Sequence, residues 1–165
     1  MTGQPPKTTL LVTGASGLLG GELVAQATRQ PYPGFLAIWG TWHSQPWTFP
    51  GSKGYALDVT DRSAVLRLVE QLQPDAIVHT AYLKDGPQAH TVTAQGSRYI
   101  AEAAEAFGAR LVHVSSDVIF DGEHAPYDEA APPAPVHAYG EAKTEAEASV
   151  PVSYTHLTLP TSDLV

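Results

Sequence analysis

Residues 10–20 read Leu-Leu-Val-Thr-Gly-Ala-Ser-Gly-Leu-Leu-Gly, and they carry the clearest structural pattern in the chain. The apolar run Leu10–Val12 stops at Thr13-Gly14, which is typical of a parallel strand that is buried on both faces. From Leu18 to Gln30 the apolar residues then recur at helical spacing. The sequence therefore predicts a turn from a strand to a helix, with glycines at three fixed points of the turn.

Each of the three glycines has a distinct use in such a turn. Gly14 permits a tight bend, Gly17 lets a ligand approach the backbone, and Gly20 lets the helix lie close to the strand. The free N–H groups at the positive end of the helix then suit a pyrophosphate. A turn without a ligand is the alternative, but its place at the first strand of a βαβ series favours a dinucleotide site. The residues expected there are Gly14, Ser16, Gly17, Leu18, Leu19 and Gly20.

Strand and helix patterns alternate along the rest of the chain. Further apolar strands are expected at 35–42, 55–57, 76–78 and 111–114. Helices are expected after Asp61, which suits an N-cap, from 89 to 107, where Gly108 ends the pattern, and from 137 to 150. This alternation predicts an α/β fold with a doubly wound parallel sheet of about five strands.

The composition excludes several classes of function. The chain has no cysteine, so disulfides and thiolate metal sites are ruled out, and its seven histidines form no H-x-x-x-H pair, so we expect no metal site. The net charge of −8 argues against a nucleic-acid partner. Neither a signal peptide nor an apolar run of about 20 residues is visible, so we expect a cytoplasmic protein without a membrane partner.

The last fourteen residues, 152–165, depart from the pattern. They contain no Ala or Gly, although the preceding segment is rich in Ala, and they show no helical or clean strand period. The segment resembles the translation of an adapter sequence, so residues 1–151 are taken as the domain and 152–165 as a foreign tail. A genuine sixth strand is the alternative, since this fold expects a strand next.

The spacing T-G-x-x-G-x-x-G from Thr13 resembles that of the short-chain dehydrogenases/reductases, a family with a Rossmann-like fold. Asp58-Val59 is similar to the acidic-apolar pair that contacts adenine in that family. The end of the fourth expected strand matches the segment beneath the cofactor, which implies contacts from Thr80, Ala81 and Tyr82. Standing alone, Asp58 is equally well explained as a turn residue.

The sequence gives only a weak indication of whether the cofactor is NAD or NADP. An acid about 20 residues beyond the glycines would hold the ribose hydroxyls of NAD, and none occurs between Pro33 and Gln45. No Arg for a 2′-phosphate occurs there either. His43 and Ser44 are able to hydrogen-bond a phosphate, which slightly favours NADP.

Tyr139 and Lys143 form a Y-x-x-x-K pair that a helix would place on one face. A phenol has an ordinary pKa of about 10, and a nearby ammonium would lower it into the range of an acid-base catalyst. An exposed helix pair is the alternative.

The residues before Tyr139 decide between these readings. Val114-Ser-Ser-Asp-Val-Ile-Phe-Asp-Gly122, then Tyr127-Asp-Glu129 and Pro135, resemble the ordered motifs of the dTDP-4-dehydrorhamnose reductases, which are extended short-chain dehydrogenases/reductases. The resemblance covers residues 8–150. It implies that Ser116, with Ser115 as the fallback, binds the substrate carbonyl, and that Tyr139 and Lys143 contact the cofactor as well as the reacting group.

Two segments depart from that family. Thr93-Ala-Gln-Gly96 stands where Asn-x-x-Gly is usual, and Val118 stands where Tyr is frequent, which leaves the sugar open. Family members also continue beyond this point into a substrate domain, so we expect an incomplete, C-terminally truncated enzyme with impaired activity.

The resemblance thus implies an NAD(P)H-dependent oxidoreductase that reduces a keto group on a nucleotide-linked sugar, and a homodimer for the full-length parent. Two alternatives stay open. One is a non-catalytic nucleotide-binding protein resembling the regulatory subunit of methionine adenosyltransferase. The other is a sugar-nucleotide epimerase or dehydratase, although a dehydratase would usually show two acids where Ser116-Asp-Val118 has one.

Overall fold

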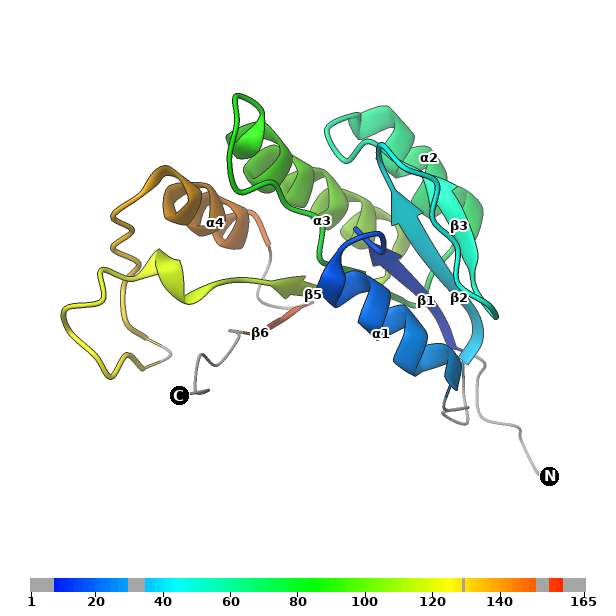
Figure 1. Cartoon of the computed structure of the whole chain (residues 1–165), viewed down its shortest axis with the longest axis horizontal. Coiled ribbons are helices and arrows are strands. Elements are labelled where there is room, and N and C mark those ends of the chain that lie inside the picture. Colours follow the sequence, from blue (N-terminus) through cyan, green and yellow to red (C-terminus); the bar gives the residue numbers. More distant parts are fainter. Residues whose placement is uncertain (1–7, 30–34, 129, 151–154, 159–165) are drawn as a thin grey trace.

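The computed structural model describes residues 8–29, 35–128, 130–150 and 155–158. Parallel strands form one central sheet, coloured from blue to red along the chain in Figure 1. Their bounds are β1 Thr8–Thr13, β2 Phe35–Trp42, β3 Lys53–Ala56, β4 Ala76–His79, β5 Arg110–Val114 and β6 Thr155–Thr158.

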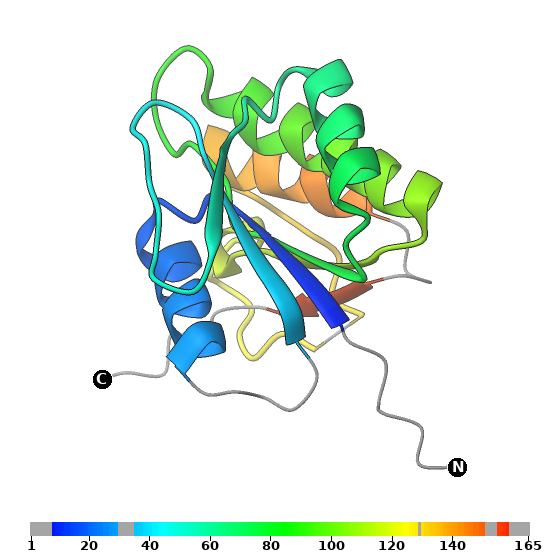
Figure 2. The same ribbon diagram turned by 90° about the vertical axis from the view of Figure 1, so that its right-hand side faces the viewer.

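Helices cover both faces of the sheet, as Figure 2 shows. One face carries α1, and the other carries α2, α3 and α4. Their bounds are α1 Leu18–Arg29, α2 Arg62–Leu72, α3 Gly96–Phe107 and α4 Ala138–Ala148, with a short π-helix η1 Thr91–Gln95 and a 3-10 turn η2 Asp117–Ile119. The expected doubly wound α/β arrangement is therefore confirmed.

The strand order is β3-β2-β1-β4-β5-β6, which is the Rossmann order. The chain reverses its direction of winding between β1 and β4, which pair in register from Leu10↔Ala76 to Thr13↔His79. The five expected strands are all present. A sixth, β6, pairs with β5, as the alternative reading of the tail anticipated. The foreign origin of residues 152–165 stays a prediction, and residues 151–154 and 159–165 lie outside the described part.

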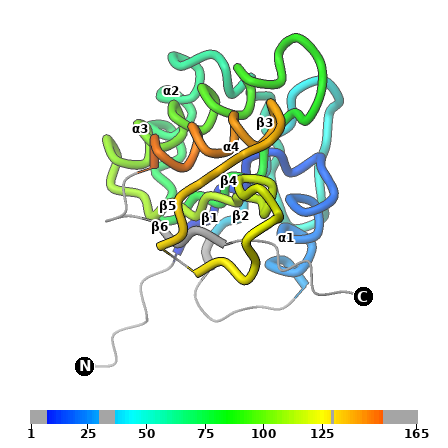
Figure 3. Tube along the Cα trace, turned by 90° about the vertical axis from the view of Figure 1, so that its left-hand side faces the viewer, coloured from blue at the N-terminus to red at the C-terminus, as the bar shows by residue number. Residues whose placement is uncertain are grey.

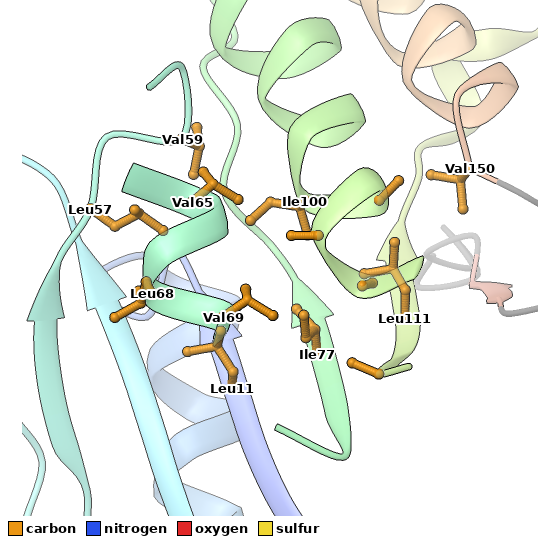
Figure 4. Close-up of a cluster of buried hydrophobic side chains, with 14 residues drawn as sticks. Leu11, Leu57, Val59, Val65, Leu68, Val69, Ile77, Ile100, Leu111 and Val150 are labelled. Carbon is orange, nitrogen blue, oxygen red and sulfur yellow. The ribbon is translucent and has the colours of Figure 1, made fainter. Parts of the chain in front are cut away.

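Strand β1 is buried on both faces because it lies in the middle of the sheet. Leu11 belongs to the cluster shared with α2 and α3, which is drawn in Figure 4. Leu10 and Val12 belong to a second cluster, packed with Val24 of α1. The uninterrupted apolar run of this strand thus supplies both layers of the core.

The ends of the helices follow the expected signals. Asp61 caps α2 by accepting the Ala64 N–H at 3.0 Å, and Gly108 ends α3 in the left-handed conformation with φ 70°. The single helix expected over residues 89–107 is confirmed as a continuous helical stretch, in which η1 has π geometry before α3 continues. Such π turns are often found at functional sites.

We expect Leu11→Ala to lower the free energy of unfolding by about 2–5 kcal/mol, because the side chain is fully buried and the sheet cannot collapse around the space. Denaturant unfolding followed by circular dichroism measures the change. Leu18→Ala is the matched control, since Leu18 is 95% exposed and its truncation should cost little. Equal losses in the two variants would contradict this core.

Candidate functional site

A cavity of about 320 Å³ opens at the carboxyl ends of β1, β2 and β4, next to the point where the winding reverses. Open α/β sheets place their ligands at this position. Its walls are formed by Gly14, Ser16, Gly17, Thr41, Trp42, His43, Ser44, Leu57, Asp58, Val59, Thr60, Thr80, Ala81, Tyr82, Leu83, Gln88 and Val92.

The glycine turn forms the floor of this cavity. Gly14 has φ +74°, and a Cβ on it would meet the backbone of Ala81 at 2.7 Å. The turn is fixed by hydrogen bonds: Gly14 N–H donates to Thr41 Oγ1 at 3.2 Å, and Ala15 N–H donates to Thr41 O at 2.8 Å. The first N–H groups of α1 have no acceptor within the helix, so the turn forms a cradle that suits a phosphate.

Asp58 lies on the opposite wall of the cavity. One of its carboxylate oxygens already accepts hydrogen bonds from within the protein. Its Oδ1 accepts from the Thr60 backbone at 2.8 Å and from the Thr60 hydroxyl at 2.7 Å. The hydroxyl of Thr60 is the main reason that the pKa of Asp58 lies below its usual value, with His43 adding to it. Oδ2 faces His43 Nε2 at 3.7 Å and stays accessible to an amine donor.

Tyr139 and Lys143 lie on α4 and do not line the cavity. Helix α4 lies on the same side of the sheet as α3 and contacts η1 and η2 (Figure 3). Both side chains approach the ring of Tyr82, which does line the cavity: the Tyr139 ring centre is 5.8 Å away and Lys143 Nζ is 5.5 Å away. The expected shared face of the pair is confirmed.

The expectation that Lys143 lowers the pKa of Tyr139 is wrong for this structure. Burial, with smaller contributions from Tyr82 and Asp117, raises the pKa of Tyr139 to about 12. Lys143 Nζ donates to Val114 O at 2.8 Å, and burial lowers its pKa to about 8. The phenol is therefore protonated at neutral pH, which suits a proton donor.

The two serines at the end of β5 have different surroundings. Ser116 is half-buried, and its hydroxyl donates to Asp117 Oδ1 at 3.2 Å. Ser115 is buried, and no described residue forms a hydrogen bond with its Oγ. Lys143 Nζ of α4 donates to the carbonyl of Val114, the last residue of β5, which places the end of β5 close to α4. Ser116 as the carbonyl donor, with Ser115 as the fallback, stays a prediction.

The loop after η2 is tied together by Asp121. Its carboxylate accepts from the Tyr127 hydroxyl, from Glu123 N–H at 2.9 Å and from His124 Nδ1 at 2.8 Å. These donors, the Tyr127 hydroxyl first, lower the pKa of Asp121 to about 2. The spacing of Asp121 and Tyr127 that was noted in the sequence therefore has a structural use.

Two buried histidines lie side by side beneath α3, with ring centres 5.6 Å apart. His79 Nδ1 is 2.6 Å from Thr13 Oγ1 and its Nε2 is 3.1 Å from Ser97 Oγ. Neither ring nitrogen of His113 has a hydrogen-bond partner among the residues that the structure describes. Burial lowers the pKa of His79 well below its usual value and that of His113 to about 4. Both rings are therefore neutral at pH 7.

We expect His113→Leu to raise the stability relative to the unsubstituted chain, and increasingly so as the pH falls from about 6.5 to about 4. Within that window His113 is protonated in the unfolded chain and neutral in the folded chain. It therefore lowers the free energy of unfolding by up to about 1.4 kcal/mol per pH unit. Removing a buried ring that has no hydrogen-bond partner within the described part of the chain should also be neutral or favourable at pH 7.

Denaturant unfolding at pH 7, 6 and 5 measures this effect. His90→Leu, at an exposed histidine, is the control and should change the free energy little at any of these pH values. A constant difference between His113→Leu and the unsubstituted chain would disprove the assigned ionisation.

Most of the predicted cofactor residues meet at the cavity. Those that line it are Gly14, Ser16, Gly17, Ser44, Asp58, Val59, Thr80, Ala81 and Tyr82. Those that do not are Leu18, Leu19, Gly20, Tyr139 and Lys143. The sequence analysis missed Thr41, Trp42, Leu57, Thr60, Leu83, Gln88 and Val92, although the position of Thr41 and Trp42 at the end of an expected strand was a usable signal.

Two negative findings apply to the described residues. No helix there is long and apolar enough to cross a membrane. No group of three or more His, Asp or Glu side chains among them is arranged to hold a metal ion.

The strand order and the glycine turn at the head of α1 define a Rossmann-like domain of the short-chain dehydrogenase/reductase class. The RmlD substrate binding domain family matches residues 8–162, so the chain belongs to that family.

Two curated relatives are similar over most of the chain. The dTDP-4-dehydrorhamnose reductase of Mycobacterium tuberculosis (strain CDC 1551 / Oshkosh) is 33% identical over 86% of this chain and 45% of its own length. The methionine adenosyltransferase 2 subunit beta of Rattus norvegicus is 34% identical over 88% of this chain and 43% of its own length. The chain thus spans less than half the length of these relatives.

A solved structure supports the same family assignment. The dTDP-4-dehydrorhamnose reductase of Bacillus anthracis str. Ames, crystallised in complex with NADP, superposes with a TM-score of 0.72 at 27% identity. The match covers 95% of this chain and 54% of that one.

Proposed function

We propose that the chain is the cofactor-binding part of an NAD(P)H-dependent reductase that acts on a keto group of a nucleotide-linked sugar. The observation that carries the proposal is the position of Tyr82, whose ring lines the cavity above the glycine turn and contacts both Tyr139 and Lys143. A cofactor site and an acid-base pair are therefore adjacent. The solved relative with NADP supports the proposed cofactor.

The cavity suits a dinucleotide in two respects. Gly14 and Gly17 place no Cβ over the turn, so the N–H groups at the start of α1 stay open to a pyrophosphate, and Asp58, which lines the cavity, would offer Oδ2 as an acceptor for the adenine amine. Ser16, Val59, Thr80 and Ala81 complete the walls. Bound there, a reduced nicotinamide supplies the hydride.

The residues of this chain would supply the proton. Tyr139 is held protonated by burial, so it donates its phenolic proton to the carbonyl oxygen as negative charge develops there. Lys143 is anchored on Val114 O and keeps a positive charge near that oxygen. Ser116, or Ser115, would donate a further hydrogen bond to it.

Tyr139→Phe should lower turnover by more than about 100-fold, because the proton donor is lost while the ring remains. The dissociation constant of the reduced cofactor should change less than about twofold, since the Tyr139 ring does not line the cavity. Turnover with a dTDP-4-keto sugar and binding by nicotinamide fluorescence measure the two quantities, in protein completed to the length of its reductase relatives. Near-normal turnover would rule out this role for Tyr139.

We further propose NADPH as the preferred cofactor, with His43 and Ser44 holding the 2′-phosphate. His43 is exposed at the cavity wall and free to turn from Asp58 towards a phosphate. His43→Ala should weaken NADPH binding by about tenfold, the size of one charge-assisted hydrogen bond, and leave NADH within about twofold. Fluorescence titration of the purified chain with each cofactor measures this preference, and equal losses for both cofactors would contradict it.

The similarity to a methionine adenosyltransferase subunit favours a second candidate, a nucleotide-binding partner protein without turnover. Turnover on dTDP-4-keto sugars, set against co-purification with a methionine adenosyltransferase catalytic subunit, separates the two. An epimerase or dehydratase activity, a homodimer and a cytoplasmic location stay predictions.

A further inference from the structure

Tyr82 occupies an unusual position for a large side chain. It is 55% exposed at the edge of the cavity, yet its ring makes two specific contacts. The Tyr139 ring is tilted by 45° against it at 5.8 Å, which lies within the range that attracts aromatic pairs. Lys143 Nζ lies 5.5 Å from the ring centre, which lies within the range of a cation–π interaction.

The backbone beside Tyr82 is clamped by one buried hydroxyl. Leu83 N–H donates to Thr93 Oγ1 at 3.1 Å, and the same hydroxyl donates to Leu83 O at 3.0 Å. Thr93 is 1% exposed and lies in the π-helix η1. A single side chain thus fixes both polar groups of the residue that follows Tyr82.

The clamp continues as a buried chain of hydrogen bonds to the glycine turn. Ser97 Oγ donates to Thr93 O at 2.6 Å, so its oxygen is left to accept from His79 Nε2–H at 3.1 Å. His79 is neutral, and its Nδ1 therefore accepts from the Thr13 hydroxyl at 2.6 Å. The chain links the residue before Gly14 to the residue after Tyr82.

We propose that Tyr82 is a positioning residue of the active site, held by the buried chain from Thr13 to Leu83, and that its ring sets the places of the Tyr139 phenol and the Lys143 ammonium. The inference rests on the proposed reductase function, because only there do Tyr139 and Lys143 have a reaction to perform. It adds a residue that acts through the catalytic pair and not on the substrate.

The groups around Lys143 make its ammonium a direct probe of Tyr82. Glu147 of α4 favours the charged form, Val114 O accepts one N–H, and the neighbouring His79 and His113 rings are neutral. Burial is the main influence on the pKa of Lys143 and brings it to about 8. Replacing Tyr82 by an aliphatic residue of similar bulk keeps Lys143 buried but removes the cation–π attraction for its ammonium. The pKa of Lys143 should therefore fall.

The test is a pH titration of the unliganded chain, labelled with ¹³C at the lysine ε carbons and followed by NMR. The chain has lysines at 7, 53, 84 and 143, and Lys143→Arg assigns the signal. Tyr82→Leu should lower the pKa of Lys143 by about 0.5 unit, whereas Tyr82→Phe keeps the ring and should leave it unchanged. An unchanged pKa in Tyr82→Leu, or the same fall in Tyr82→Phe, would overturn the positioning role.

A second pair of variants tests the clamp. Thr93→Val removes the hydroxyl and keeps the shape, so the pKa of Lys143 should fall as in Tyr82→Leu, while Thr93→Ser keeps an Oγ and should restore it. Equal values in Thr93→Val and the unsubstituted chain would overturn the clamp. If circular dichroism shows that Thr93→Val does not fold, the Tyr82 pair decides the proposal by itself.

The lysine titration needs neither cofactor nor turnover, so it fails independently of the proposed function. If the pKa changes are as predicted but the chain does not bind NADPH, the positioning role of Tyr82 is supported and the proposed reductase function is refuted. NADPH binding with unchanged lysine pKa values would refute only the role of Tyr82.

Discussion

The contact between the backbone of Gly14 and that of Ala81 is the constraint on which the site depends. A Cβ at Gly14 would lie 2.7 Å from the Ala81 backbone, so the turn after β1 is able to rest on the end of β4 only because that atom is missing. Thr80 strengthens the junction by donating its hydroxyl to Thr13 O at 2.7 Å. The floor of the cavity and the segment that carries Tyr82 are therefore set by one close approach of two strand ends.

Most of the buried ionisable groups around this junction are neutral. Two buried imidazoles are neutral, a buried ammonium rests on a carbonyl, and a phenol is held in its protonated form. Lys143 is thus the buried side chain of this group that carries charge at neutral pH, and it lies beside the proton donor. A buried ammonium among neutral groups stabilises negative charge that develops on a nearby oxygen.

Local signals in the sequence were sufficient for the architecture. The cap at Asp61, the stop at Gly108 and the glycine turn follow from the backbone needs of a few adjacent residues, and all three are found. The sign of the pKa shift at Tyr139 was wrong because burial depends on how α4 packs against distant segments. The π turn at Thr91–Gln95 and the contact of Tyr82 with Tyr139 were missed for the same reason, since neither has a simple spacing.

Helix α4 rests mainly on η1 and η2, two irregular segments, whereas α2 and α3 pack against each other above the sheet. An exposed pair, His90 with Glu145 at 3.0 Å, adds little to hold it. Regions with fewer buried apolar contacts open at lower free energy than the core. By this rule we expect the helix with Tyr139 and Lys143 to open before the nucleotide cradle does, so that amide exchange would begin there.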